Sequence, residues 1–184
     1  MLKTHRGRGT RGLIRTTLAS ALLLSSWAMS GLTTAATANS AQTAALPATY
    51  RITNVASHST LRAYTAGGEV FVSSTRENPG PFELWTIKRN ESGYTLQNVG
   101  LGMLPMSDSY AAARQATEGE AVTTSRNAGT WSIAPAGEGT YVIKVPGEDL
   151  LWNVEPPVVP RGEVKLRGAN GSDTQRWTLV PVAE

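Results

Sequence analysis

The chain has 184 residues, no cysteine, 40% hydrophobic residues and a formal charge of +3, which fits one globular domain with or without a tail. Eighteen glycines and ten prolines favour a turn-rich β-protein. All five basic residues of the first 38 lie from Lys3 to Arg15, which leaves 12 basic and 14 acidic residues and a charge of about −2 for the rest. The basic character therefore belongs to the N-terminal segment, and the remainder does not indicate a nucleic-acid-binding surface.

The first 38 residues have the order of an export signal. A basic segment, MLKTHRGRGTRGLIR, precedes the apolar run LASALLLSSWAMSGL and an A-x-A site at residues 36–38. An uncleaved membrane anchor is the alternative, but the apolar run is short and is interrupted by Ser and Gly. We expect a signal peptide over residues 1–38, cleavage before Asn39, a flexible spacer over residues 39–48 and a secreted domain over residues 49–184.

A short pattern of Trp, a hydroxyl residue, then Ile or Leu occurs three times in the exported part. The copies are LWTIKR (84–89), TWSIAP (130–135) and RWTLVP (176–181). Trp85, Trp131 and Trp177 are 46 residues apart in both intervals, which indicates an internal repeat. Because a tryptophan buries a large apolar area, we expect all three in the core.

Three further families of strand-like segments accompany the tryptophans. A Tyr-x-Ile/Leu family, whose alternation favours half-buried strands, comprises residues 50–55, 94–99 and 141–146. A family with Val one or two residues after a Glu comprises residues 69–74, 120–125 and 163–168. A looser apolar family comprises residues 61–65, 102–108 and 150–155. The sequence therefore predicts four strands in each repeat.

Twelve strands in three repeats of about 46 residues resemble a β-trefoil, an all-β fold in which six strands form a barrel and three hairpins cap it. Closing the barrel removes the sheet edges. The resemblance covers residues 50–182. A three-bladed propeller and a β-sandwich are alternatives, although a sandwich does not explain the regular period.

Enzyme chemistry has little support in the sequence. His58 is the only histidine after residue 38, and its neighbours Ser57 and Ser59 do not form a nucleophile–base pair merely by being adjacent. We interpret His58 as an exposed turn residue. Cysteine nucleophiles, phosphate-binding glycine loops and metal-binding motifs do not occur. The sequence therefore predicts a non-enzymatic binding protein without a cofactor or a metal.

One resemblance concerns the ends of the repeats. The closing Q-R-W at Trp177 resembles the Q-x-W with which each repeat of ricin-type lectins ends, whereas the other repeats read E-L-W and G-T-W. This resemblance implies a sugar pocket built from an Asp and an exposed aromatic side chain. The candidate residues are Asp149, Trp152 and Asn153 in the third repeat, or Asp108 and Tyr110 in the second.

A second resemblance covers the whole trefoil. The run YVIKVPGEDLLWNVEPP…GEVKLRGANGSDTQRWTLVP resembles the fungal β-trefoil serine-protease inhibitors of the cospin type. That family implies one reactive residue between the second and third strands of a repeat, but in the first repeat this connection, YTAGGEV, has no basic residue at its tip. The candidates on other loops are Arg114 in SDSYAAARQATEGE (107–120), Arg161 in EPPVVPRGE (155–163) and Arg76 in STRENPGPFE (74–83).

These observations predict a secreted β-trefoil serine-protease inhibitor, with Arg114 ranked before Arg161 and Arg76. A carbohydrate-binding lectin is the second hypothesis, and a non-catalytic adhesion module is the third. The expected partner is a trypsin-like protease or another extracellular protein, or alternatively a glycan. Nucleic acid is not expected, nor is a membrane after the signal peptide is removed, and we expect a monomer.

Overall fold

The computed structural model describes residues 49–75, 78 and 80–182 of the chain. The predicted signal peptide, the spacer and the candidate Arg76 lie outside the described residues. The described residues form twelve strands: β1 (Thr49–Asn54), β2 (Thr60–Arg62), β3 (Phe71–Ser73), β4 (Leu84–Asn90), β5 (Gly93–Asn98), β6 (Tyr110–Ala112), β7 (Thr123–Ser125), β8 (Ser132–Pro135), β9 (Thr140–Lys144), β10 (Leu150–Val154), β11 (Arg161–Gly168) and β12 (Trp177–Pro181). They also form one short helix, α1 (Val99–Gly102), and two 3₁₀ turns, Gly80–Glu83 and Asp173–Gln175.

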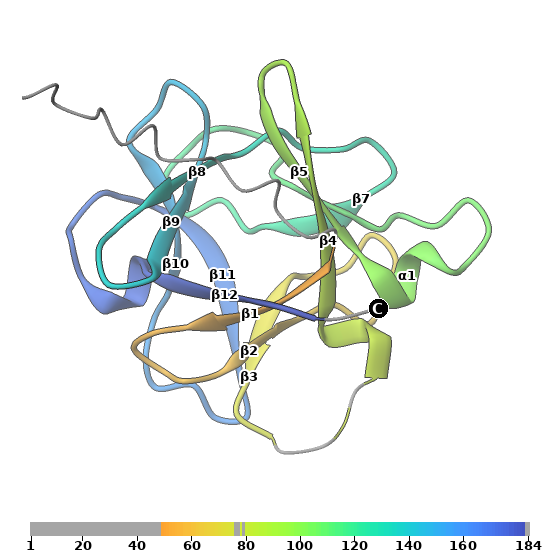
Figure 1. Cartoon of the computed structure of the whole chain (residues 1–184), viewed down its shortest axis with the longest axis horizontal. Coiled ribbons are helices and arrows are strands. Elements are labelled where there is room, and N and C mark those ends of the chain that lie inside the picture. The colour runs from red at the N-terminus through yellow and green to blue at the C-terminus, as the bar shows by residue number, and fades with distance from the viewer. Residues whose placement is uncertain (1–48, 76–77, 79, 183–184) are drawn as a thin grey trace, which may run out of the picture. The chain divides into compact units, whose positions relative to one another are not determined.

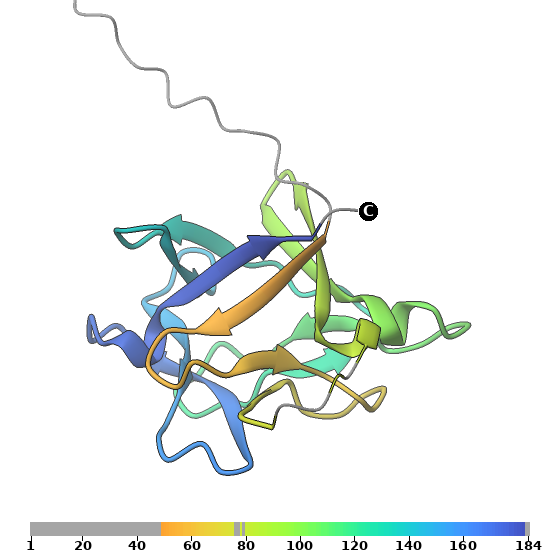
Figure 2. The same ribbon diagram turned by 60° about the horizontal axis from the view of Figure 1, so that its bottom comes forward.

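Six of these strands close a barrel (Figure 1). Antiparallel pairs join β1 to β4, β4 to β5, β8 to β9, β9 to β12 and β12 back to β1. A bridge between Tyr94 and Trp131 joins β5 to the start of β8. Figure 2 shows the first and last strands, in orange and dark blue, running side by side in the barrel wall.

Three hairpins, β2–β3, β6–β7 and β10–β11, cap the barrel. They meet in a ring of backbone hydrogen bonds made by Val70, Val122 and Val164. The Val70 N–H donates to the Val122 carbonyl at 2.9 Å, Val122 to Val164 at 2.9 Å, and Val164 back to Val70 at 3.1 Å. Each valine belongs to a different repeat, so the ring marks the pseudo-threefold axis. The chain is a β-trefoil, as the repeat period predicted.

The three repeat tryptophans are buried and make equivalent contacts. Each indole N–H donates to a backbone carbonyl on the second strand of its own repeat: Trp85 to Leu61 at 3.1 Å, Trp131 to Ala111 at 3.0 Å, and Trp177 to Trp152 at 3.3 Å. A buried indole N–H usually has such a partner. The prediction that these residues form the core is confirmed.

The predicted strand over residues 102–108 is wrong. This segment follows α1 as a loop, and β6 begins only at Tyr110. The apolar side chains of Met103, Leu104 and Met106 are 68%, 52% and 78% exposed, so they do not form the buried face of a strand. The loop projects from the body of the domain (Figure 1).

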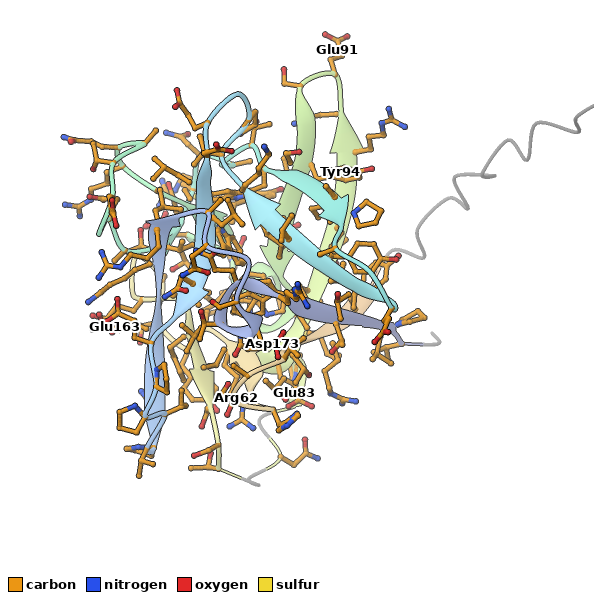
Figure 3. All side chains as sticks on the ribbon, turned by 90° about the vertical axis from the view of Figure 1, so that its left-hand side faces the viewer. Arg62, Glu83, Glu91, Tyr94, Glu163 and Asp173 are labelled. Atoms are coloured by element: carbon orange, nitrogen blue, oxygen red, sulfur yellow. The ribbon has the colours of Figure 1, made fainter. Side chains whose placement is uncertain are left out.

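A carboxylate of the first repeat is held between two arginines. Glu83 Oε1 accepts hydrogen bonds from Arg51 Nε at 2.9 Å and Nη2 at 2.7 Å, and Arg62 Nη2 lies 3.8 Å from Glu83 Oε2. The Arg62 side chain is buried and also donates to Tyr64 Oη and to Thr75. Figure 3 shows Arg62 and Glu83 next to each other at the lower end of the molecule. The cluster ties the 3₁₀ turn before β4 to strands β1 and β2.

Candidate functional site

A cavity of about 400 Å³ lies beside the β6–β7 hairpin in the second repeat. Asp108, which directly precedes this hairpin, and Arg114, at the start of the β6–β7 loop, both line it. The structure therefore brings together two residues that the sequence assigned to different hypotheses. The other polar lining residues are Thr123, Thr124, Ser125 and Asn127.

The hollow exists because small residues line it. Ala112, Ala113, Ala128 and Gly129 contribute little side-chain volume. A Cβ atom on Gly129 would lie 2.6 Å from the Ala111 carbonyl oxygen and 2.9 Å from the Ala112 Cα, so the backbone there leaves no room for a side chain.

The third repeat fills the corresponding position. Gln175, like Gly129, stands two residues before the repeat tryptophan, and it is buried. Its Nε2 donates to the Gly168 carbonyl at 2.8 Å, and its Oε1 accepts from the Asn170 N–H at 2.9 Å. Gly129 has no side chain, so the second repeat lacks this pair of hydrogen bonds.

The charges at the cavity are unevenly paired. Arg126 Nε lies 3.4 Å from Asp108 Oδ1, and the Asp108 side chain is 35% exposed. Arg114 is exposed, and its guanidinium makes no hydrogen bond or ion pair within residues 49–75, 78 and 80–182. One arginine at the rim is thus neutralised by Asp108, and the other is not.

Several polar groups at the cavity are free to meet a ligand, while others support the walls. Thr124 Oγ1 donates to the Thr65 carbonyl at 2.9 Å and so fixes β7 to the tight turn of the first repeat. Ser125 Oγ accepts from the Asn127 N–H at 3.2 Å. Among the described residues the Asn127 side-chain amide has no partner, so it can donate to and accept from a ligand hydroxyl.

The site expected in the third repeat is not built as the sequence suggested. Trp152 is fully buried and packs edge-to-face against Trp131 at 4.9 Å and Trp177 at 6.1 Å between ring centroids. It cannot present a ring to a sugar, because β10 points it into the core as β2 points Leu61 and β6 points Ala111. Asn153 is also buried and accepts from Thr174 Oγ1 at 2.8 Å. Asp149 alone of the three is exposed, with a 90% exposed side chain.

Arg161 begins β11, and its guanidinium lies over two aromatic rings. Its Cζ atom is 4.4 Å from the centre of the Phe71 ring and 5.4 Å from that of Tyr64. These contacts stabilise the cation where it lies. Entering the pocket of a protease would require Arg161 to leave both rings, whereas Arg114 has no such contacts to lose.

A smaller cavity of about 280 Å³, lined in part by Arg161, also contains one ion pair. Lys165 Nζ lies 2.6 Å from Glu163 Oε2, and this hydrogen bond lowers the pKa of Glu163 and raises that of Lys165. Glu163 is labelled at the left-hand edge of the molecule in Figure 3. At the barrel, burial raises the pKa of the Tyr50 phenol, and the nearby Tyr141 and Tyr94 add to the effect.

His58 lies exposed in the turn between β1 and β2 with a positive φ of 50°, as interpreted from the sequence. Across residues 49–75, 78 and 80–182, no group of three His, Cys, Asp or Glu side chains is placed to hold a metal ion. A helix long and apolar enough to cross a membrane is not found in that part of the chain.

Comparison with solved structures gives the same fold. The ricin B-like lectin of Macrolepiota procera, solved with lactose, aligns with a TM-score of 0.62 at 20% identity over 73% of this chain and 96% of that one. The Rhizoctonia solani agglutinin aligns with a TM-score of 0.62 at 22% identity over 73% and 96%. The designed threefold-symmetric protein ThreeFoil aligns with a TM-score of 0.62 at 18% identity over 73% and 99%.

The structural neighbours are ricin B-like β-trefoil lectins, the more distant of the two resemblances seen in the sequence. At these identities the similarity establishes the fold. No protein-family model matches the chain, and no curated protein matches it.

Sequence reasoning selected Asp108 and Arg114 but missed the lining residues Thr123, Asn127 and Gly129. A signal for the missed part was present. The second repeat reads G-T-W where the third reads Q-R-W, so the sequence already shows that the second repeat lacks this polar side chain.

Proposed function

We propose that this domain is a non-catalytic carbohydrate-binding module whose sugar site is the cavity of the second repeat. The observation that carries the proposal is the lining: a carboxylate at Asp108, hydroxyls on β7 and an unpartnered amide at Asn127 converge on one space of about 400 Å³. Such groups donate to and accept from sugar hydroxyls. The lactose bound by the Macrolepiota procera lectin supports the same ligand class on this fold.

A glycan array followed by calorimetric titration of the best ligand tests this function. Asn127→Ala and Asp108→Asn should each weaken binding about tenfold or more, because each removes a hydrogen-bonding group at the ligand. Asp149→Asn is the matched control: it changes a 90% exposed carboxylate in the third repeat and should leave affinity unchanged. Equal affinities for all four proteins, or no glycan binding at all, would overturn the proposal.

Serine-protease inhibition is the second candidate, and one observation favours it. Arg114 lies exposed, without a polar partner among the described residues, on the connection between the second and third strands of its repeat. A trypsin-like protease accepts one such cation in a deep acidic pocket. Titration of a trypsin-like protease panel with wild type, Arg114→Ala and Arg161→Ala tests it. Loss of inhibition in Arg114→Ala alone supports this function, and absence of inhibition by the wild type excludes it for that panel.

We also propose that residues 1–38 direct export, so that the domain acts outside the cell and meets an extracellular glycan or protein. The basic, apolar, then A-x-A order of this segment supports the proposal. N-terminal sequencing of protein recovered from culture medium should begin near Asn39. Recovery of soluble protein that still begins at Met1 would contradict it.

A further inference from the structure

The net charge at the cavity of the second repeat is set by Arg114. Three charged side chains lie in or beside this space, and Arg126 and Asp108 pair with each other at 3.4 Å. The opposite charges of this pair largely cancel each other's electric field at a distance. Arg114 has no carboxylate within ion-pair distance among the described residues, so it leaves one uncompensated positive charge at the rim.

The cavity also lacks a flat apolar surface. Its described lining residues are small, hydroxyl-bearing, amide or charged, and none of them is aromatic. A pyranose ring bound here therefore gains no stacking energy. Affinity must come from hydrogen bonds and charge, and a guanidinium next to a cavity offers a planar pair of donors that matches a carboxylate or a sulfate.

We infer that this cavity selects saccharides that carry an anionic group, either a carboxylate or a sulfate ester, and that Arg114 is the residue that binds the anion. The inference rests on the proposed carbohydrate-binding function and narrows its ligand class. Asp108, Thr123 and Asn127 meet the neutral hydroxyls of the ring, and Arg114 meets the anion at the rim.

The test uses a panel of hexosides, each in three forms: neutral, with a carboxylate at C6, and with a sulfate at C6. Binding to the full exported chain is measured by nuclear magnetic resonance titration at low and high salt. For the wild type we expect at least one anionic form to bind about tenfold more tightly than its neutral parent, with the ratio shrinking at high salt. The carboxylate and sulfate arms identify which anion is preferred.

Arg114→Gln should bring the anionic ligand down to the affinity of the neutral form and leave the neutral form unchanged. Arg89→Gln, which removes an exposed arginine of β4 that does not line the cavity, is the matched control and should change neither. Asp108→Asn releases Arg126 from its carboxylate. It should therefore weaken the neutral ligand while raising the ratio of anionic to neutral affinity.

The two proposals fail differently. Equal binding of neutral and anionic forms to the wild type overturns the anionic preference and leaves carbohydrate binding standing. An anionic preference that survives Arg114→Gln overturns the role of Arg114. If acetate or sulfate alone binds as tightly as the anionic hexosides, the cavity is a simple anion site and the saccharide inference is wrong. If none of the hexosides binds, the proposed function fails with it.

Discussion

The second and third repeats share one backbone plan but treat the position two residues before their tryptophan in opposite ways. In the third repeat Gln175 is buried and bonds to the backbone at Gly168 and Asn170. In the second repeat the residue is Gly129, and a cavity of about 400 Å³ lies there. The repeat tryptophan is therefore kept even where the polar side chain two residues before it is absent, and the cavity lies in the repeat that lacks this side chain.

The first repeat gives a third solution at the same position. Glu83 is buried there with a charge, and Arg51 and Arg62 supply the opposite charges. The fold therefore accepts an amide, an ion pair or nothing at this point, provided that the tryptophan two residues later keeps its hydrogen bond.

The largest effect is expected where the repeats are alike. Trp85→Ala, Trp131→Ala and Trp177→Ala should each cost roughly 3–5 kcal/mol of unfolding free energy, because each empties a large buried volume. Denaturant unfolding of the three variants measures the loss. A near-wild-type denaturant midpoint for any one variant would show that the three tryptophan positions are not equivalent.

Exchanging the polar residue two positions before the tryptophan between repeats should lower the unfolding free energy slightly less. Glu83→Gln gives the first repeat the glutamine of the third and removes the charge that accepts two hydrogen bonds from Arg51, at a cost of about 1.5–3 kcal/mol. Gln175→Glu should also destabilise, since a carboxylate oxygen would face the Gly168 carbonyl. Thermal and denaturant unfolding would measure both, with exposed Asp149→Asn as an unchanged control. Wild-type stability in both variants would mean that the position is interchangeable.

Adding a side chain at the closely packed Gly129 of the second repeat should lower the unfolding free energy by about 1–3 kcal/mol. Gly129→Ala places a Cβ 2.6 Å from the Ala111 carbonyl oxygen, so backbone must shift. Gly168→Ala is the matched control, because a Cβ there has no neighbour within 4 Å, and its stability should be unchanged or slightly higher. Equal denaturant midpoints for the two variants would contradict the close packing at Gly129.

A smaller difference in stability is expected between variants of two core tryptophans of the third repeat. Trp177→Phe loses the hydrogen bond from the indole to the Trp152 carbonyl, whereas the buried Trp152 indole N–H has no partner among the described residues. Trp152→Phe should therefore cost about 1 kcal/mol less than Trp177→Phe. Calorimetric melting of the two variants would detect the gap, and the reverse order would show that volume outweighs hydrogen bonding here.

The smallest effect concerns the pH dependence of the third hairpin. Lys165 lowers the pKa of Glu163 in the folded state, so this pair contributes stability above the unfolded pKa of a glutamate and loses it as pH falls through the lowered value. Both side chains are more than one-third exposed, which limits the contribution to less than about 1 kcal/mol. Glu163→Gln should lower stability slightly at neutral pH and converge with the wild type in acid. A constant difference at every pH would rule the pair out.

The fold was predictable because its signals repeat. Three tryptophans with one spacing and three valines after glutamates specify equivalent positions in three copies, and the structure confirms both sets. The same reasoning failed over residues 102–108, where Met103, Leu104 and Met106 gave the composition of a strand. Composition does not show whether an apolar residue is buried, and the other two repeats have no comparable segment to reveal the insertion.

The site was predictable only in part, for a related reason. Trp152 stands where Leu61 and Ala111 stand in the other repeats, so alignment of the repeats would have placed it in the core. Asp108 and Arg114 were identified separately, Asp108 by the resemblance to ricin-type lectins and Arg114 by its place on a long loop. Their convergence on one cavity depends on the packing around Gly129, which a sequence pattern alone does not reveal.

The ladder between β1 and β12 determines how the domain must assemble. Residues at opposite ends of the described chain pair directly, Asn54 with Trp177 and Ile52 with Leu179, and the Val182 N–H donates to the Thr49 carbonyl at 3.0 Å. No barrel can close until both ends are present. Loss of β1 would leave β4 and β12 with bare edges, and loss of β12 would leave β1 and β9 with bare edges. The domain is therefore a single cooperative folding unit. Its contact order is high, so it should fold slowly for its size, and neither half should be stable alone.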